Sequence, residues 1–291
     1  MAYVGRFAPS PTGPLHLGSL TTAAASFLDA RHGGGRWLLR IEDLDTPRVV
    51  PGAADAIVRT LEHLGFTWEG PVIHQSRRLT LYQQALDDLA PRGLIYACSC
   101  SRRDRGGTDD TGGYAGTCRK GPTRPGPVAT RFRADLNPVP DLADRLLGRC
   151  GPDRAAGGDP ILRRRDGLYA YQLAVVVDDA EQQVTDIVRG ADLLPSTYWQ
   201  RSLQSALGVP QQRYAHLPLV CEADGRKLSK SAHAVNGAIA GASELLWRVL
   251  SLLRQAPPPE LRQAPPPELW SWAILHWRLE SLRGLAHLDA N

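Results

Sequence analysis

The 291-residue chain has no uninterrupted apolar stretch long enough to cross a membrane, which takes roughly 18 residues or more. Its first residues, Met1 to Arg6, also lack the basic segment and apolar core of a signal peptide. We therefore expect a cytoplasmic protein that does not insert into membranes.

Cysteine and lysine are both scarce. The five Cys form an odd set in a chain without a secretion signal, which argues against a disulfide framework. Only Lys120, Lys227 and Lys230 are Lys among the 34 basic residues. Two Lys so close together, in a chain that otherwise uses Arg, indicate chemistry that needs a compact ammonium group. The net charge of +4 permits a nucleic-acid partner but does not establish one.

Strand and helix patterns alternate through the first and last thirds of the chain, which predicts an α/β fold with a parallel sheet. The apolar run 169–177 fits a strand or a buried helix equally well. The expected strands are Tyr3–Phe7, Trp37–Ile41 and Val184–Val188, and the expected helices are Leu20–Arg31, Pro51 to about Gly65, and Thr197–Leu207.

Two regions depart from this pattern. Residues 99–165 are rich in Gly, Pro, Arg and Asp, and we interpret them as an insertion that leaves the sheet. Residues 242–291 are helical in pattern but contain the tandem octapeptide RQAPPPEL at 254–261 and 262–269. Three consecutive prolines exclude a continuous helix there, so we expect the second copy to lengthen a surface loop.

A turn rich in Pro and Gly, Pro9 to Ser19, follows the first strand and precedes the first helix. In an α/β sheet this position faces the ligand crevice. Gly13 and Gly18 leave room for a phosphate or base, and the helix N-terminus favours negative charge. His16 can donate to a phosphate oxygen. An incidental histidine in a plain turn is the alternative.

A second basic motif, Lys227-Leu-Ser-Lys230-Ser, follows an acidic turn. Its two ammonium groups and two hydroxyls suit a loop that closes over a triphosphate and stabilises charge in a transition state. A solvated basic loop is the alternative for this motif taken alone.

Together these motifs resemble the HIGH and KMSKS signatures of class I aminoacyl-tRNA synthetases. The segments 6–13, 39–45 and 188–192 are similar to the glutamyl-tRNA synthetase branch. The resemblance implies a Rossmann-like catalytic domain formed by 1–97 and 166–236. An inserted zinc-bearing subdomain would occupy 98–165, and 237–291 would form a short helical segment without an anticodon-binding domain.

The resemblance also implies the roles of individual residues. Selecting glutamate needs guanidinium groups for its carboxylates and an anion for its amine. Arg6 and Arg189 would bind the carboxylates, Glu42 the α-ammonium, and Tyr171 would add a hydrogen bond. The remaining predicted glutamate contacts are Phe7, Ala8, Pro9 and Ser10. His16 and Lys230 are the predicted catalytic residues, and ATP, with Mg²⁺, would bind His16, Gly18, Lys227 and Lys230.

Three of the five cysteines, Cys98, Cys100 and Cys118, lie close in sequence and suit zinc, which requires a fourth ligand. Buried structural cysteines are the alternative. A relative of the glutamyl enzymes carries the same spacing with a tyrosine as fourth ligand, and Tyr114 matches that tyrosine. One Zn²⁺ per chain is therefore expected, with Asp109, Asp110 or water replacing Tyr114 if the tyrosine does not bind.

Only 60 residues follow Ser231, too few for an anticodon-reading domain of normal size. The chain thus resembles truncated paralogues of glutamyl-tRNA synthetase that attach glutamate to queuosine in the anticodon loop of tRNA(Asp). Its expected partners are L-glutamate, ATP and that tRNA, and we expect a monomer. A minimal enzyme that charges a tRNA 3′ end, and a non-catalytic tRNA-binding paralogue, are the alternatives.

Overall fold

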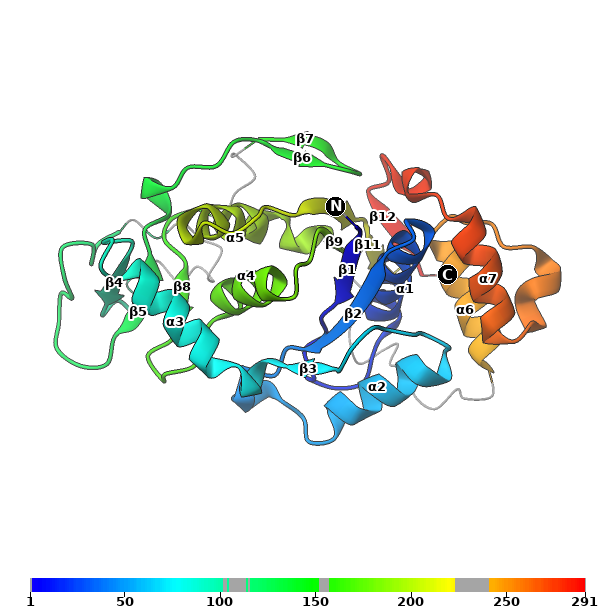
Figure 1. The fold of residues 1–291 in the computed structure, drawn as a ribbon, viewed down its shortest axis with the longest axis horizontal. Helices are drawn as coiled ribbons and strands as arrows, with labels where there is room; N and C mark the ends of the chain where they lie inside the picture. Colours follow the sequence, from blue (N-terminus) through cyan, green and yellow to red (C-terminus); the bar gives the residue numbers. More distant parts are fainter. Residues whose placement is uncertain are drawn as a thin grey trace.

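The computed structural model describes residues 2–101, 104, 114, 116–151, 157–222 and 241–290. Two largely parallel sheets lie in the middle of the molecule (Figure 1). A backbone hydrogen bond of 2.9 Å from Thr185 N to Val4 O joins them at one edge. The first sheet has the order β1 (Val4–Phe7), β2 (Arg36–Ile41), β3 (Ile73–His74), and the second has the order β7 (Gly148–Cys150), β6 (Leu142–Asp144), β10 (Arg213–Leu217), β9 (Asp186–Gly190).

The expected α/β fold is confirmed, and the apolar run that sequence left undecided is a helix. Residues 173–176 of α4 are at most 1% exposed, because α4 packs against α3, α5 and β8. A helix buried on several sides shows no clear periodicity, which is why the pattern could not identify it. The first five helices are α1 (Leu17–His32), α2 (Ala53–His63), α3 (Leu79–Leu89), α4 (Tyr171–Glu181) and α5 (Leu194–Leu207).

The insertion contributes a small antiparallel sheet at one end of the molecule, opposite α6 and α7 (Figure 1). Two of its strands, β5 (Ala129–Phe132) and β8 (Ile161–Arg163), pair with each other, and β5 also pairs with β4 (Ile95–Cys98), which precedes the insertion. The β6–β7 hairpin lies within the same stretch of sequence, but β6 pairs in parallel with β10 of the main sheet. Strand pairing thus returns to the main sheet before residue 166. The division of the chain into domains stays a prediction.

The C-terminal segment packs on the far side of α1 with α6 (Ala242–Leu252) and α7 (Pro266–His276). Because β1 and β2 cover its other side, α1 is buried nearly all round and is rich in Ala. The chain then returns to pair β12 (His287–Asp289) with β11 (Leu219–Cys221). None of the helices in the described ranges has both the length and the hydrophobicity needed to span a bilayer.

The second octapeptide copy is not simply a loop, and that expectation was wrong. Its last prolines form the first turn of α7, where the missing N–H and preset φ of proline are tolerated. Leu269 at the end of this copy is fully buried in the main core. In the first copy the prolines lead into a short 3-10 helix, Pro259–Gln263.

Candidate active site

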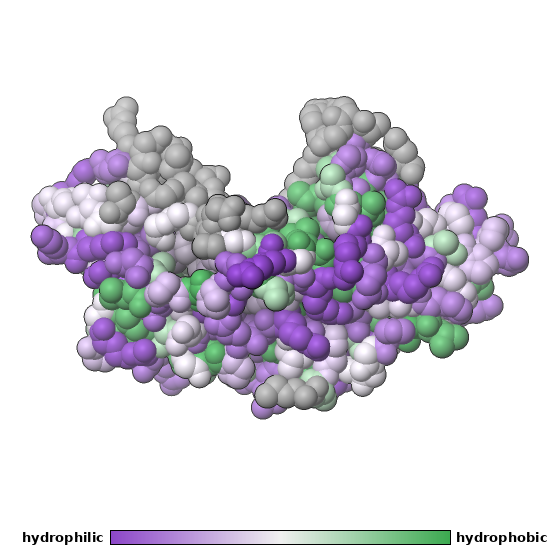
Figure 2. Space-filling view, turned by 90° about the horizontal axis from the view of Figure 1, so that it is seen from above, coloured by the Kyte–Doolittle hydropathy of each residue, from purple (hydrophilic) through white to green (hydrophobic). Residues whose placement is uncertain are grey.

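A cavity of about 1020 Å³ opens where β1, β9 and β10 end, the edge at which parallel sheets bind ligands. On the face shown in Figure 2, hydrophobic side chains gather beside a hollow in the middle of the molecule. The cavity is lined by every predicted glutamate-binding residue and by the described ATP-binding residues: Arg6, Phe7, Ala8, Pro9, Ser10, His16, Gly18, Glu42, Tyr171 and Arg189. The motifs that fall within the described residues therefore meet at one place, and their individual roles stay predictions.

Arg189, on β9, is a buried cation at this cavity. Unlike Arg6, it has no carboxylate beside it among the described residues. It is 3% exposed, yet it forms no ion pair with any of the residues that the structure describes. Its Nη1 donates to Tyr171 Oη at 3.2 Å and its Nη2 to Thr197 Oγ1 at 2.7 Å. A buried guanidinium held by neutral groups provides a site for an anionic ligand.

Arg6, on β1, is instead part of a buried ion network. Its Nε lies 3.2 Å from Asp179 Oδ1, and Arg40 Nη2 lies 2.7 Å from the same oxygen. Burial alone would raise the pKa of Asp179, but Arg6 and Arg40 lower it below its ordinary value. Asp179 is thus an anion that anchors Arg6 at the cavity wall.

Glu42 follows β2 and faces the cavity beside this network. Its backbone N donates to Pro9 O at 2.9 Å, which ties it to the turn after β1. Its Oε1 accepts no hydrogen bond from the described residues and lies 3.5 Å from Arg40 Nη2. Burial raises the pKa of Glu42 to about 7, although Arg40 and Arg6 oppose the shift. A buried carboxylate with an unused oxygen suits a cationic ligand.

The turn before α1 has the features of an anion site. His16 caps the helix, since its Nδ1 accepts from Ser19 N at 3.3 Å and its Nε2 lies 2.8 Å from Ser19 Oγ. A Cβ on Gly18 would lie 3.3 Å from the His16 ring, so Gly leaves that ring undisturbed. The predicted ATP residues Lys227 and Lys230 lie outside the described residues.

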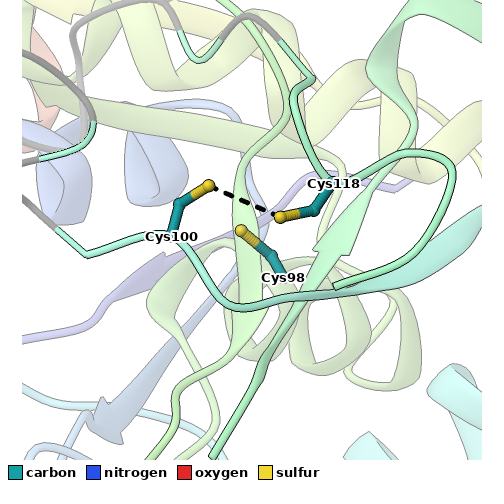
Figure 3. Close-up of side chains that lie close together, drawn as sticks. All are labelled: Cys98, Cys100 and Cys118. Atoms are coloured by element: carbon teal, nitrogen blue, oxygen red, sulfur yellow. Dashed lines mark hydrogen bonds between the residues drawn. The ribbon is translucent and has the colours of Figure 1, made fainter. Parts of the chain in front are cut away.

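Three thiols of the insertion point toward one another (Figure 3). The Sγ atoms of Cys98, Cys100 and Cys118 lie within 4.8 Å of one another, so this group can hold a metal ion. Tyr114 brings a fourth donor. Its hydroxyl lies 3.3 Å from Cys98 Sγ and 3.5 Å from Cys100 Sγ, and it accepts from Cys118 N at 2.9 Å.

The surroundings of these donors also suit a metal. Burial would raise the pKa of Cys118, but hydrogen bonds from Tyr114 and neighbouring groups lower it to about 5, which favours a thiolate. Arg131 lies over the Tyr114 ring, with Cζ 3.9 Å from the centroid, and holds the ring in place. Three sulfurs and one oxygen match the four-ligand shell that zinc prefers. The alternative ligands Asp109 and Asp110 lie outside the described residues.

Several residues next to Arg189 were missed by the sequence analysis. Thr197 and His216 contact its guanidinium, and Asp144 contacts His216. None belongs to a motif that the sequence analysis used, and Asp144 lies in the stretch interpreted as an insertion. Their pairing depends on β6, β9 and β10 becoming neighbours, which local patterns do not reveal.

Comparisons with known proteins agree with this geometry. Residues 3–241 match the family model of class I tRNA synthetases (E and Q), catalytic domain. A protein of Dechloromonas aromatica named Glutamyl-Q tRNA(Asp) synthetase is 48% identical over 288 residues, 96% of this chain and 95% of that protein. A protein of the same name from Ectopseudomonas mendocina is 51% identical over 281 residues, 95% of this chain and 93% of that protein.

A solved structure extends the comparison to the fold. A glutamate tRNA ligase from Elizabethkingia meningosepticum, in complex with its amino acid, superposes with a TM-score of 0.80 at 26% identity. The match covers 100% of this chain and 67% of the ligase chain. The full described architecture thus corresponds to about two thirds of that ligase.

Proposed function

This chain belongs to the class I tRNA synthetases of the glutamate and glutamine branch, and we propose that it joins L-glutamate to queuosine in the anticodon loop of tRNA(Asp). The observation that carries the proposal is similarity along about 95% of both chains to relatives named Glutamyl-Q tRNA(Asp) synthetase. The glutamate tRNA ligase, by contrast, is matched over 67% of its length.

The first step is activation of glutamate by ATP. The α-carboxylate of glutamate attacks the α-phosphorus, a P–O bond forms, and pyrophosphate leaves with the electrons of the broken P–O bond. Arg6 and Arg189 bind the carboxylates, Glu42 binds the α-ammonium, and Tyr171 donates a hydrogen bond. Holding both reactants in this cavity supplies positioning and electrostatic stabilisation, and no covalent bond to the protein is needed.

The nucleotide binds along the turn before α1. The α1 N-terminus and His16 face the phosphates, Gly18 permits close approach, and Lys227 and Lys230 complete the site. Mg²⁺ accompanies ATP and neutralises phosphate charge. In the second step a hydroxyl of queuosine attacks the carbonyl carbon of the adenylate, and AMP leaves.

Cys98, Cys100, Cys118 and Tyr114 would hold one Zn²⁺ in the insertion. All four donors are protein groups, which is the closed shell of structural sites rather than the open shell of catalytic ones. A bound ion would therefore stabilise the fold of the insertion and would not act in the transfer. We also propose that the protein acts in the cytoplasm, as a monomer.

Transfer of labelled glutamate to three tRNA(Asp) preparations tests the acceptor. The fully modified tRNA should be labelled, the same tRNA without queuosine should not, and removal of the 3′-terminal adenosine should make little difference. Labelling that survives loss of queuosine but requires the 3′ adenosine would support a minimal enzyme that charges the 3′ end. Absence of glutamate-dependent ATP–pyrophosphate exchange would support a non-catalytic tRNA-binding paralogue.

A further inference from the structure

The residues behind Arg189 form a hydrogen-bonded chain that crosses three neighbouring strands. His216, on β10, pairs in register with Arg189 on β9, and Asp144 ends β6 on the other side of β10. His216 Nδ1 lies 2.6 Å from Asp144 Oδ2, and its Nε2 lies 2.9 Å from Thr197 Oγ1 and 3.4 Å from Arg189 Nε. The side chains of Asp144 and His216 are fully buried.

From these contacts we propose that Asp144 and His216 are positioning residues that hold Arg189 in the orientation in which it binds glutamate. The inference deepens the proposed function and rests on the role of Arg189 in it. Neither residue belongs to the sequence motifs that indicate glutamate binding. In this proposal neither residue contacts the substrate. Both act through Arg189 and Thr197.

The protons along the chain follow from the partners. Burial would raise the pKa of Asp144, but His216 and the backbone N–H groups of Leu146 and Leu147 lower it, so Asp144 is a carboxylate. Burial and Arg189 lower the pKa of His216, although Asp144 opposes the shift, and this favours the neutral imidazole. Since Asp144 can only accept, the imidazole proton lies on Nδ1, and Nε2 is an acceptor that faces Arg189 and Thr197.

This arrangement leaves Arg189 with a defined pair of unused donors. A guanidinium has five N–H groups. Among the residues described, His216 takes the Nε proton, Tyr171 one proton of Nη1 and Thr197 one of Nη2. One N–H then remains on each terminal nitrogen. Two such N–H groups form the fork that binds a carboxylate through two parallel hydrogen bonds.

Asp144→Asn tests the proposal because it keeps the shape and reverses the polarity of one hydrogen bond. An amide N–H donates to Nδ1 and moves the imidazole proton to Nε2, which then faces the Arg189 donors. The KM for glutamate in ATP–pyrophosphate exchange should rise roughly tenfold or more, the usual effect of spoiling a buried charge-assisted hydrogen bond. The KM for ATP and the rate at saturating glutamate should change less than about twofold.

A matched pair at Thr197 provides the second measurement, in case Asp144→Asn fails to fold. Thr197→Ser keeps the hydroxyl that links His216 to Arg189 and should retain the wild-type KM for glutamate. Thr197→Val keeps the shape without the hydroxyl and should raise it. If the Val and Ser variants have equal KM values for glutamate, or if a folded Asp144→Asn variant keeps the wild-type value, the inference is wrong.

Failure of the inference is separable from failure of the proposed function. Arg189→Ala reports on the function itself. If this variant loses glutamate affinity while Asp144→Asn and Thr197→Val do not, only the positioning role is contradicted. If Arg189→Ala keeps wild-type glutamate affinity, the assigned role of Arg189 is contradicted as well. Thermal unfolding of each variant shows whether lost packing, rather than lost orientation, explains a change.

Discussion

At the scale of single residues, Arg189 carries the clearest expectation. It is buried without a carboxylate partner among the described residues, so an anionic ligand in the cavity would compensate its charge. Arg189→Ala should raise the KM for glutamate by at least about 30-fold, because truncating one partner of a buried charge pair costs roughly 2 kcal/mol or more. Exchange kinetics measure this value.

Arg149→Ala is the matched control for that variant. Arg149 is also an Arg on a strand, but it is 84% exposed and pairs with Asp141 outside the cavity. Its loss should leave the KM for glutamate within about twofold of wild type. Equal effects of the two substitutions would mean that general loss of positive charge, rather than a carboxylate site, weakens binding.

The raised pKa of Glu42 predicts that kcat/KM for glutamate depends on pH. Burial raises its pKa to about 7, so below that pH the substrate-free protein holds Glu42 protonated. The α-ammonium of glutamate prefers the ionised form, and binding must then release a proton. As pH falls below about 7, kcat/KM for glutamate should therefore drop, approaching tenfold per pH unit. Above about pH 8, kcat/KM for glutamate should no longer change with pH.

The Glu42→Gln variant should lose this dependence. A neutral amide cannot titrate, so its kcat/KM for glutamate should be low throughout and vary little between pH 5.5 and 8, apart from any change shared with the KM for ATP. A pH profile that keeps the wild-type shape in this variant would assign the titration to another group. Profiles measured for ATP at saturating glutamate separate the two substrates.

The predictable residues were those that belong to contiguous motifs. Arg6 and Arg189 are the second-last residues of β1 and β9, and Ser10 and Glu42 come after β1 and β2. All four belong to motifs, and the strand ends of a parallel sheet meet at one edge. Asp144 and His216 were not predictable, because their contact joins positions 72 residues apart through strand pairing. Sequence patterns predict where a strand lies in the chain, but they do not predict which other strand it pairs with.

At the scale of elements, the repeated octapeptide shows how context decides structure. Both copies have the same sequence, yet Leu269, in the first turn of α7, is fully buried while Leu261 is only half-buried. Leu269→Ala should lower the free energy of unfolding by roughly 2–5 kcal/mol. Leu261→Ala, in the same local sequence, should cost clearly less. Chemical unfolding of the two variants measures the difference, and equal losses would contradict the described packing.

The insertion permits a second expectation at this scale. Purified protein should contain about one zinc per chain, measured by elemental analysis of untagged protein. Tyr114→Phe keeps the ring beneath Arg131 but removes the oxygen beside the thiols, so zinc affinity should fall roughly tenfold or more. Competition with a chelator measures this change.

Tyr96→Phe is the control for the metal site. The Tyr96 ring packs beside the cysteines, but its hydroxyl donates to Asp159 Oδ2 at 2.7 Å and is not one of the donors around the thiols. Its loss should leave zinc affinity unchanged. If Tyr114→Phe binds zinc as tightly as Tyr96→Phe does, the fourth ligand is not the tyrosine, and a metal-free but fully folded protein would exclude the site altogether.

At the scale of the whole molecule, the two ends of the chain are tied into one core. Trp277 Nε1 donates to Asp29 Oδ1 at 3.1 Å, and Arg145 also pairs with Asp29. The C-terminal helices therefore complete the burial of α1, whose N-terminus carries His16 into the cavity. The sequence predicted helices in this segment, but their docking on α1 depends on tertiary contacts that periodicity does not encode.

This single core leads to the last prediction, which concerns when the active site is assembled. Arg6 is anchored by Asp179, and Arg189 by Tyr171 and Thr197. These contacts all lie within one chain, so the protein itself supplies the groups that orient these donors. Preorganised groups of this kind need no further rearrangement to stabilise a transition state. Glutamate-dependent ATP–pyrophosphate exchange should therefore proceed without RNA. Adding tRNA(Asp) should change its rate by less than about twofold, or ~0.4 kcal/mol in barrier. Exchange that begins only after tRNA is added would mean that RNA must reshape the cavity, and tRNA lacking queuosine would then show whether the modified base or the body of the RNA causes it.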